Sequence, residues 1–208
     1  MSERALPNII VTGTPVSVLI FNFLFYYHHY FPWILSLNTK TNFFFFKGTG
    51  KSSHAQLMAE RMPDMKLFAI NDIAKERDCI TGYDDVRQSS IVDEDKLLDA
   101  IEPDLERGGL IVDWHCCDIF PERLIDLVVV LTASTDKLYD RYKERGYSEV
   151  KLQENLDAEI MQVLLSEARD SYEEEIVISL ESNEVDELEE NVDRIVQWRE
   201  AWEKQNRD

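Results

Sequence analysis

Short apolar runs alternate along the chain with longer stretches in which apolar residues recur at helical spacing. The short runs are typical of buried β-strands and cover residues 9–11, 67–70, 110–112, 127–131 and 176–178. The longer stretches are typical of helices and include residues 96–107, 134–145 and 156–169. This alternation predicts an α/β fold, in which a parallel sheet carries helices on both faces.

The last part of the chain predicts a long amphipathic helix. Val185, Leu188, Val192, Ile195 and Trp202 share one face, and acidic residues lie opposite. We therefore expect Trp202 to pack against the core rather than to contact a ligand.

A nucleotide-binding motif is written in two pieces. Residues 13–15 read G-T-P and follow the first predicted strand, and residues 48–53 read G-T-G-K-S-S and open a helical pattern. Joined directly, they give G-T-P-G-T-G-K-S-S, which fits the G-x-x-x-x-G-K-[ST] pattern at every fixed position. The strand before and the helix after are the context that this motif requires, so we expect a nucleotide phosphate site.

The motif needs these residue types for a physical reason. Glycines let successive backbone N–H groups curl around a polyphosphate at the positive end of the following helix. The residues expected around the phosphates are Gly13, Gly48, Thr49, Gly50, Lys51, Ser52 and Ser53. Lys51 is expected to reach the β- and γ-phosphates, and the Ser52 hydroxyl is expected to bind Mg²⁺.

Residues 16–47 separate the two pieces and have an unusual composition. These 32 residues contain no acidic side chain, and their only lysines are Lys40 and Lys47. The apolar part is long enough for a membrane anchor, since about 20 apolar residues cross a bilayer. A spanning helix, however, would hold the two halves of one phosphate loop about 30 Å apart. A genuine loop insertion is a second explanation.

A translated intron is the third explanation and the one we favour. Val16 requires a codon that begins with GT, Lys47 can have a codon that ends in AG, and the phenylalanines 43–46 require a pyrimidine-rich tract. Thr41-Asn42 can be encoded by ACTAAC, which resembles a splicing branch site. These features occur in the order of an intron, and removing the segment restores a complete motif. The 208-residue product is then expected to be a poor enzyme.

Length, charge and cysteine content narrow the possible functions. A chain of 208 residues, or 176 without the insertion, is long enough for a single domain. A formal net charge of −19 argues against a broad nucleic-acid-binding face and favours either plain solubility or a basic partner. The polar N-terminus predicts no signal peptide, and Cys79, Cys116 and Cys117 predict neither a disulfide framework nor a metal pair. We therefore expect an intracellular protein.

Candidate chemistry follows the strand predicted at residues 110–112. Ligands in open α/β sheets bind beyond the carboxyl ends of the strands, and Asp113 lies directly at such an end. Asp113 is our candidate for the second half of the Mg²⁺ site, although an aspartate that merely begins a turn is the alternative. His115 follows two residues later and can position a water or polarise a phosphate oxygen, or it can be a structural histidine.

Several segments resemble adenylate kinase isoenzyme 6. They are I-I-V-T-G-T-P joined to G-T-G-K-S-S, D-I-A-K-E, G-Y-D-D, D-E-D-K, the run G-G-L-I-V-D-W-H-C-C-D-I-F-P-E-R, L-Y-D-R-Y-K-E-R-G-Y and E-E-N-V-D-R-I-V-Q-W. The resemblance covers the chain except residues 16–47. It implies a three-layer P-loop nucleoside monophosphate kinase fold, made of one domain over residues 1–208 with a central five-stranded parallel sheet.

The resemblance also implies a function and the segments that carry it. It implies phosphoryl transfer between ATP and AMP, ATPase activity, and a role in small-ribosomal-subunit maturation, with a basic ribosomal protein and the pre-ribosomal particle as partners. It assigns AMP binding to residues 69–92, a short lid to residues 144–154, the ATP phosphates to the motif around Lys51, and the catalytic strand-end positions to Asp113 and His115; we expect Lys51 to be catalytic as well. Lys75 departs from the family, which often has arginine near AMP, and lysine lacks the planar fork that grips phosphate.

The lid region contains two arginines four residues apart. Arg141 and Arg145 share a helix face and can both approach a transferring phosphoryl group, and we favour Arg145 as the ATP-binding and catalytic residue because it lies at the helix end. A solvated basic face is the alternative. An ATP-driven assembly switch with little kinase flux is the rival function. We expect the protein in nucleus and cytoplasm, with no direct membrane partner.

Overall fold

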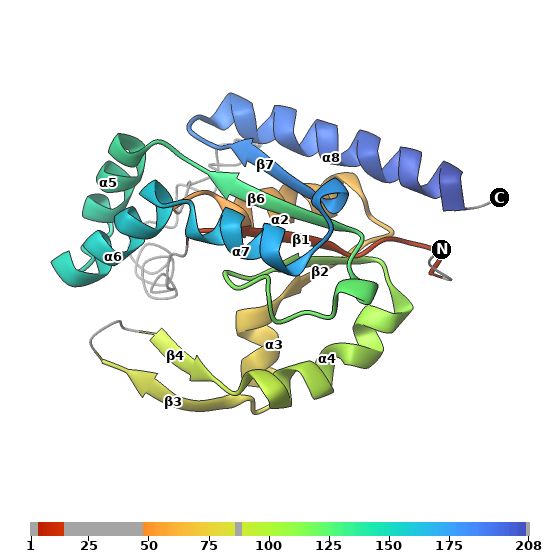
Figure 1. Ribbon diagram of the computed structural model, residues 1–208, viewed down its shortest axis with the longest axis horizontal. Helices are drawn as coiled ribbons and strands as arrows, with labels where there is room; N and C mark the ends of the chain where they lie inside the picture. The colour runs from red at the N-terminus through yellow and green to blue at the C-terminus, as the bar shows by residue number, and fades with distance from the viewer. Residues whose placement is uncertain (1–3, 15–47, 86–88, 207–208) are drawn as a thin grey trace, which may run out of the picture.

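The computed structural model describes residues 4–14, 48–85 and 89–206. A five-stranded sheet forms its centre, with the strand order β2-β5-β1-β6-β7, and every neighbouring pair is parallel (Figure 1). The strands are β1 (Ile9–Gly13), β2 (Lys66–Ala69), β5 (Leu110–Asp113), β6 (Leu127–Thr132) and β7 (Val177–Glu181). All five predicted strands are confirmed, and so is the predicted α/β fold.

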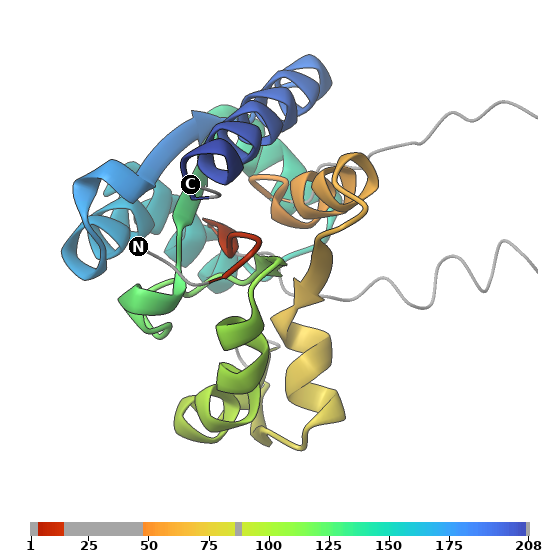
Figure 2. The same cartoon turned by 90° about the vertical axis from the view of Figure 1, so that its right-hand side faces the viewer.

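Helices cover both faces of this sheet. They are α2 (Lys51–Arg61), α3 (Ile70–Glu76), α4 (Glu94–Arg107), α7 (Val163–Ser171) and α8 (Val185–Asn206), while α5 (Thr135–Glu144) and α6 (Glu149–Ile160) pack mainly against each other. Because side chains alternate along a strand, Ile9 and Val11 of β1 pack under α2 and α8, whereas Ile10 packs toward α3, α4 and α7. Figure 2 shows α2 in orange next to α8 in dark blue on the first face.

The strands β1 and β6 are buried along nearly their whole length. Every residue of β1 is buried, and the last residue of β6 is the only one of that strand that is not. Such continuous apolar burial on both faces is the environment of a parallel sheet covered by helices. It gives the strand ends fixed positions from which loops can hold catalytic groups.

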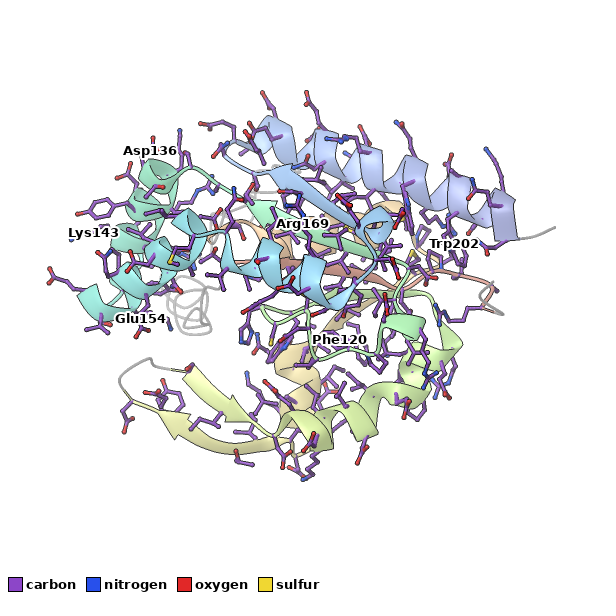
Figure 3. The ribbon with its side chains drawn as sticks, in the orientation of Figure 1. Phe120, Asp136, Lys143, Glu154, Arg169 and Trp202 are labelled. Atoms are coloured by element: carbon purple, nitrogen blue, oxygen red, sulfur yellow. The ribbon has the colours of Figure 1, made fainter. Side chains whose placement is uncertain are left out.

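The predicted helix over residues 156–169 is wrong in one respect. The chain forms two helices there, α6 and α7, which meet at Met161 and Gln162. Gln162 has a φ of 51°, a left-handed conformation that breaks the helical path. The predicted lid, residues 144–154, comprises the turn between α5 and α6 and the first part of α6; Lys143 and Glu154, at the left in Figure 3, mark the two helices.

The segment assigned to AMP contains structure that the sequence pattern did not predict. After α3, an antiparallel hairpin is formed by β3 (Ile80–Asp84) and β4 (Ser89–Val92). Lys75 of α3 lies 3.9 Å from Asp72, in an exposed pair. In Figure 1 the hairpin and the α5–α6 pair both extend beyond the carboxyl ends of the strands.

The predicted C-terminal helix is confirmed as α8. Leu188, Val192 and Ile195 are fully buried against the sheet face that α2 also covers. Val185 is 47% exposed and does not belong to that buried stripe. Within the described residues, no helix is both long and apolar enough to span a bilayer; residues 16–47 lie outside them.

Candidate nucleotide-binding site

The two pieces of the phosphate motif lie against each other in space. A Cβ atom on Gly13 would lie 2.4 Å from Oγ1 of Thr49 and 2.6 Å from the carbonyl oxygen of Leu131, so no side chain fits at that position. Gly13 also has a φ of 154°. The end of β1 and the start of α2 therefore meet closely although 34 residues separate Gly13 from Gly48 in the sequence.

The start of α2 has the features of an anion site. Gly50 is its N-cap, with a left-handed φ of 83° and no side-chain cap, and the first turn contains no acidic residue. The first N–H groups of a helix have no intrahelical partners and carry partial positive charge. By contrast, α4 begins with Asp93 as a side-chain cap followed by two acidic residues. The described residues of the motif thus offer backbone donors to a phosphate.

The side chain of Lys51 connects the second piece of the motif to the first. Its Nζ donates to the carbonyl oxygens of Gly13, at 3.0 Å, and Thr14, at 3.2 Å. Burial lowers the pKa of Lys51 to about 8, while Asp113 and Glu159 act in the opposite direction. The amine is therefore mostly charged at neutral pH, and no carboxylate among the described residues forms an ion pair with it, which suits a group that binds a polyphosphate.

The two predicted metal ligands are brought together. The Ser52 hydroxyl, at the start of α2, donates to Oδ2 of Asp113 at 2.6 Å, at the end of β5. Burial raises the pKa of Asp113, and Lys51 and Ser52 partly oppose this shift. A hydroxyl and a carboxylate are hard oxygen ligands, and Mg²⁺ usually takes one or two of these together with water and phosphate oxygens. The pair therefore fits Mg²⁺ bound with a nucleotide.

His115 lies beyond β5, with its ring 4.2 Å from that of Trp114. Desolvation, followed by the charge of Lys51, lowers its pKa to about 4. The residue is nevertheless exposed to solvent. Water screens much of this effect, so we expect a neutral ring at pH 7 but little influence on stability.

The two lid arginines have different surroundings. Arg145 is half-buried at the end of α5, desolvation lowers its pKa, and its charge reaches Lys51. Arg141 instead donates to the carbonyl oxygens of Gly48, at 2.8 Å, and Ser182, at 3.0 Å. Arg141 therefore anchors the second motif piece to the loop before α8, whereas Arg145 interacts with Tyr147 and lies close enough to Lys51 to lower the pKa of its amine.

A buried histidine on α2 contacts the backbone of the second motif piece. His54 is fully buried on α2, and its Nδ1 lies 3.0 Å from the carbonyl oxygen of Gly50. Its Nε2 lies 3.4 Å from Nδ2 of Asn191, which also donates to the carbonyl oxygen of Glu181 at 2.7 Å. This arrangement assigns the proton to Nδ1 and connects the motif to α8. Burial lowers the pKa of His54 to about 4.

This histidine predicts a loss of stability in mild acid. The unfolded chain takes up the proton near pH 6.5 and the folded protein only near pH 4, so the free energy of unfolding falls as pH decreases through that window. The slope attributable to His54 approaches 1.4 kcal/mol per pH unit, about 3 kcal/mol in all. Urea unfolding of wild type and His54→Leu between pH 7.5 and 4.5 measures it; parallel pH dependences would refute the assignment.

Sequence patterns missed three supporting contacts around the site. They are the anchoring of Gly48 by Arg141, the bond between His54 and Gly50, and the bonds of Glu159 to residues at the ends of β1 and β6. Glu159 falls on the same helical spacing as Leu152 and Leu156, so a carboxylate on an apolar stripe was a readable signal. The described residues contain no cluster of three or more potential metal-ligating side chains, and their three cysteines are free.

Comparisons with known proteins agree with this geometry. A family model described as an AAA domain matches residues 46–162. The solved structure of a gluconokinase from Sinorhizobium meliloti superimposes with a TM-score of 0.53 at 17% identity, over 98% of this chain and 99% of that one. A five-stranded parallel sheet between helices is thus a P-loop kinase fold, as expected.

Curated relatives match over nearly the whole chain. Adenylate kinase isoenzyme 6 homolog HBR1 of Candida albicans is 50% identical over 95% of this chain and 71% of its own length. The homolog FAP7 of Saccharomyces cerevisiae is 45% identical over 100% of this chain and 89% of its own length. The Schizosaccharomyces pombe homolog is 42% identical over 97% of this chain and 97% of its own length. Identity at this level and coverage shows common descent and not merely a shared fold. The chain belongs to the adenylate kinase isoenzyme 6 family.

Proposed function

We propose that this protein transfers the γ-phosphoryl group of ATP to AMP and also hydrolyses ATP. The observation that carries the proposal is the Ser52–Asp113 pair next to the Lys51 amine, where β1 and β5 end. Two oxygen ligands for a metal ion, a charged amine and the free N–H groups at the start of a helix can together bind a polyphosphate with its metal. The names of the curated relatives point to adenylate as the acceptor.

The chain's own residues would act by position and charge. Lys51 moves from the carbonyl oxygens of Gly13 and Thr14 to the β- and γ-phosphates, and Arg145 stabilises charge on the transferring group. Ser52 and Asp113 would hold Mg²⁺, which neutralises the phosphates when bound. An oxygen of the AMP phosphate forms the new bond to the γ-phosphorus as the bond to the β,γ-bridging oxygen breaks. His115 can position the attacking group.

Residues on either side of the strand ends would close the site. The segment 69–92 contributes α3 and the β3–β4 hairpin, and we propose that it receives AMP. The segment 144–154 is proposed as the lid over ATP. Both flank the carboxyl ends of the strands, where open α/β sheets bind ligands.

An ATP-dependent assembly switch is the second candidate. The net charge of −19 is compatible with a basic partner as well as with plain solubility. We propose that the partner is a small-subunit ribosomal protein, which the chain binds in the nucleus and cytoplasm during maturation of the pre-ribosomal particle. In that case nucleotide binding and hydrolysis would control the partner, with little flux to AMP.

One pair of assays separates the two functions. ADP formation is measured with ATP alone and with ATP plus AMP, in the presence of Mg²⁺. The kinase proposal expects formation that depends on AMP and is saturable in it. AMP-independent hydrolysis that rises only on addition of a basic ribosomal protein would support the switch and contradict the kinase.

A further inference from the structure

Glu159 lies in the last turn of α6, on the face that this helix buries. Leu152, Asn155 and Leu156 are buried on α6, and Glu159 continues this face three to four residues later. The side chain itself is partly buried. A carboxylate in such a place is costly unless hydrogen bonds compensate for lost water.

Its two oxygens bind residues just beyond two different strands. Oε1 accepts from the backbone N–H of Ala133, at 2.8 Å, which follows β6. Oε2 accepts from the hydroxyl of Thr14, which is itself 1% exposed and follows β1. The cavity beside these groups measures about 10 Å³, room for one water molecule at most. Within the described residues, both carboxylate oxygens of Glu159 are thus bound to protein groups.

Thr14 links Glu159 to Lys51 of the phosphate motif. It is the last described residue of the first motif piece, and its carbonyl oxygen accepts from Nζ of Lys51 at 3.2 Å. A continuous series of contacts thus runs from α6 through Glu159 and Thr14 to Lys51. Because α6 begins within the lid segment, the same series connects the lid to the phosphate motif.

We propose that Glu159 is a positioning residue that holds the first motif piece in place against Lys51 and couples the lid helix to it. The inference deepens the proposed phosphoryl transfer and rests on it for its effect on turnover. Glu159 acts through Thr14 and touches no substrate. A small displacement of a group that positions a substrate is enough to lower turnover severalfold.

The test compares Glu159→Gln, Thr14→Val and the double variant with wild type in the full chain. Each single change is expected to lower kcat about tenfold while KM for AMP stays within about twofold. The double variant should be no slower than the worse single variant, because both changes act on the same contact, between Glu159 and Thr14. Asp157→Asn, on the exposed side of α6, should resemble wild type. Thr14→Ser, which keeps the hydroxyl, should recover most of the kcat that Thr14→Val loses.

Hydrogen exchange provides a readout that does not need activity. Backbone amides of residues 48–53 should exchange at least about threefold faster in Glu159→Gln than in wild type or Asp157→Asn. Unchanged exchange, or kcat losses that multiply in the double variant, would overturn the proposal. If wild type itself lacks AMP-dependent turnover while the exchange result holds, the proposed function fails and the positioning role stands.

Discussion

Lys51→Ala is expected to lower kcat by about 10²- to 10³-fold while leaving the fold intact. Lys51 is the one residue of the motif whose charged group spans both pieces, with its Nζ on the carbonyl oxygens of Gly13 and Thr14. Removing a preorganised charged donor from a developing oxyanion typically costs this much. The loss should also appear as weaker ATP binding, because the same amine meets the ground-state phosphates.

A matched lysine variant checks that this loss is specific. Lys204 is exposed near the end of α8, outside the site, and Lys204→Ala removes the same charge and chain length. Its kcat should equal that of wild type, and thermal melting should show all three proteins folded. Wild-type turnover in a folded Lys51→Ala protein would contradict the role assigned to Lys51.

Asp113→Asn is expected to lower kcat about 100-fold and to raise the Mg²⁺ concentration needed for half-maximal activity. Asparagine keeps the shape of the side chain and its place beside the Ser52 hydroxyl but removes the charge that binds the metal. The measurement is a titration of turnover with Mg²⁺ at saturating nucleotide. Asp99→Asn, an exposed change on α4, should leave the titration unchanged.

The same substitution should not destabilise the protein. Burial raises the pKa of Asp113, so the ionised carboxylate is held in the folded state at a cost. Replacing it with a neutral group removes that cost, and the melting temperature of Asp113→Asn should equal or exceed that of wild type. A large loss of stability would indicate that Asp113 is structural, and unchanged Mg²⁺ dependence would remove it from the metal site.

The sheet was predictable because its signal is local. Strands such as β1 and β6 are buried on both faces, so each appears in the sequence as a continuous apolar run. The meeting of Ser52 with Asp113 was also predictable, since in a parallel sheet the carboxyl ends of the strands share one edge. A motif and a strand end were sufficient to identify both residues.

The supporting contacts depend on long-range geometry that no local pattern contains. Thr14 and Glu159 are 145 residues apart in the sequence, and Arg141 and Gly48, which are also hydrogen-bonded, are 93 residues apart. The break between α6 and α7 depends on the left-handed Gln162, a conformation that few non-glycine residues adopt. The two strands of the β3–β4 hairpin lack a clear alternating pattern of apolar residues, and every residue in them is partly or fully exposed.

The segment 16–47 lies outside the described residues, and its origin stays a hypothesis. We propose that it is encoded by an unspliced intron, because its removal restores a complete phosphate motif and its ends can encode splice sites. Sequencing of the transcript across this junction tests the proposal. A mature message that retains these codons uniformly would rule it out in favour of a loop insertion or a membrane anchor.

The central claim is that residues 13–15 and 48–53 form one phosphate-binding loop. The most direct test is calorimetric titration of MgATP into the 176-residue form that lacks residues 16–47, beside the 208-residue chain. The account predicts one site per chain in the shorter form, weaker binding in the longer form, and loss of binding with Lys51→Ala. A folded 176-residue protein that does not bind MgATP would contradict it.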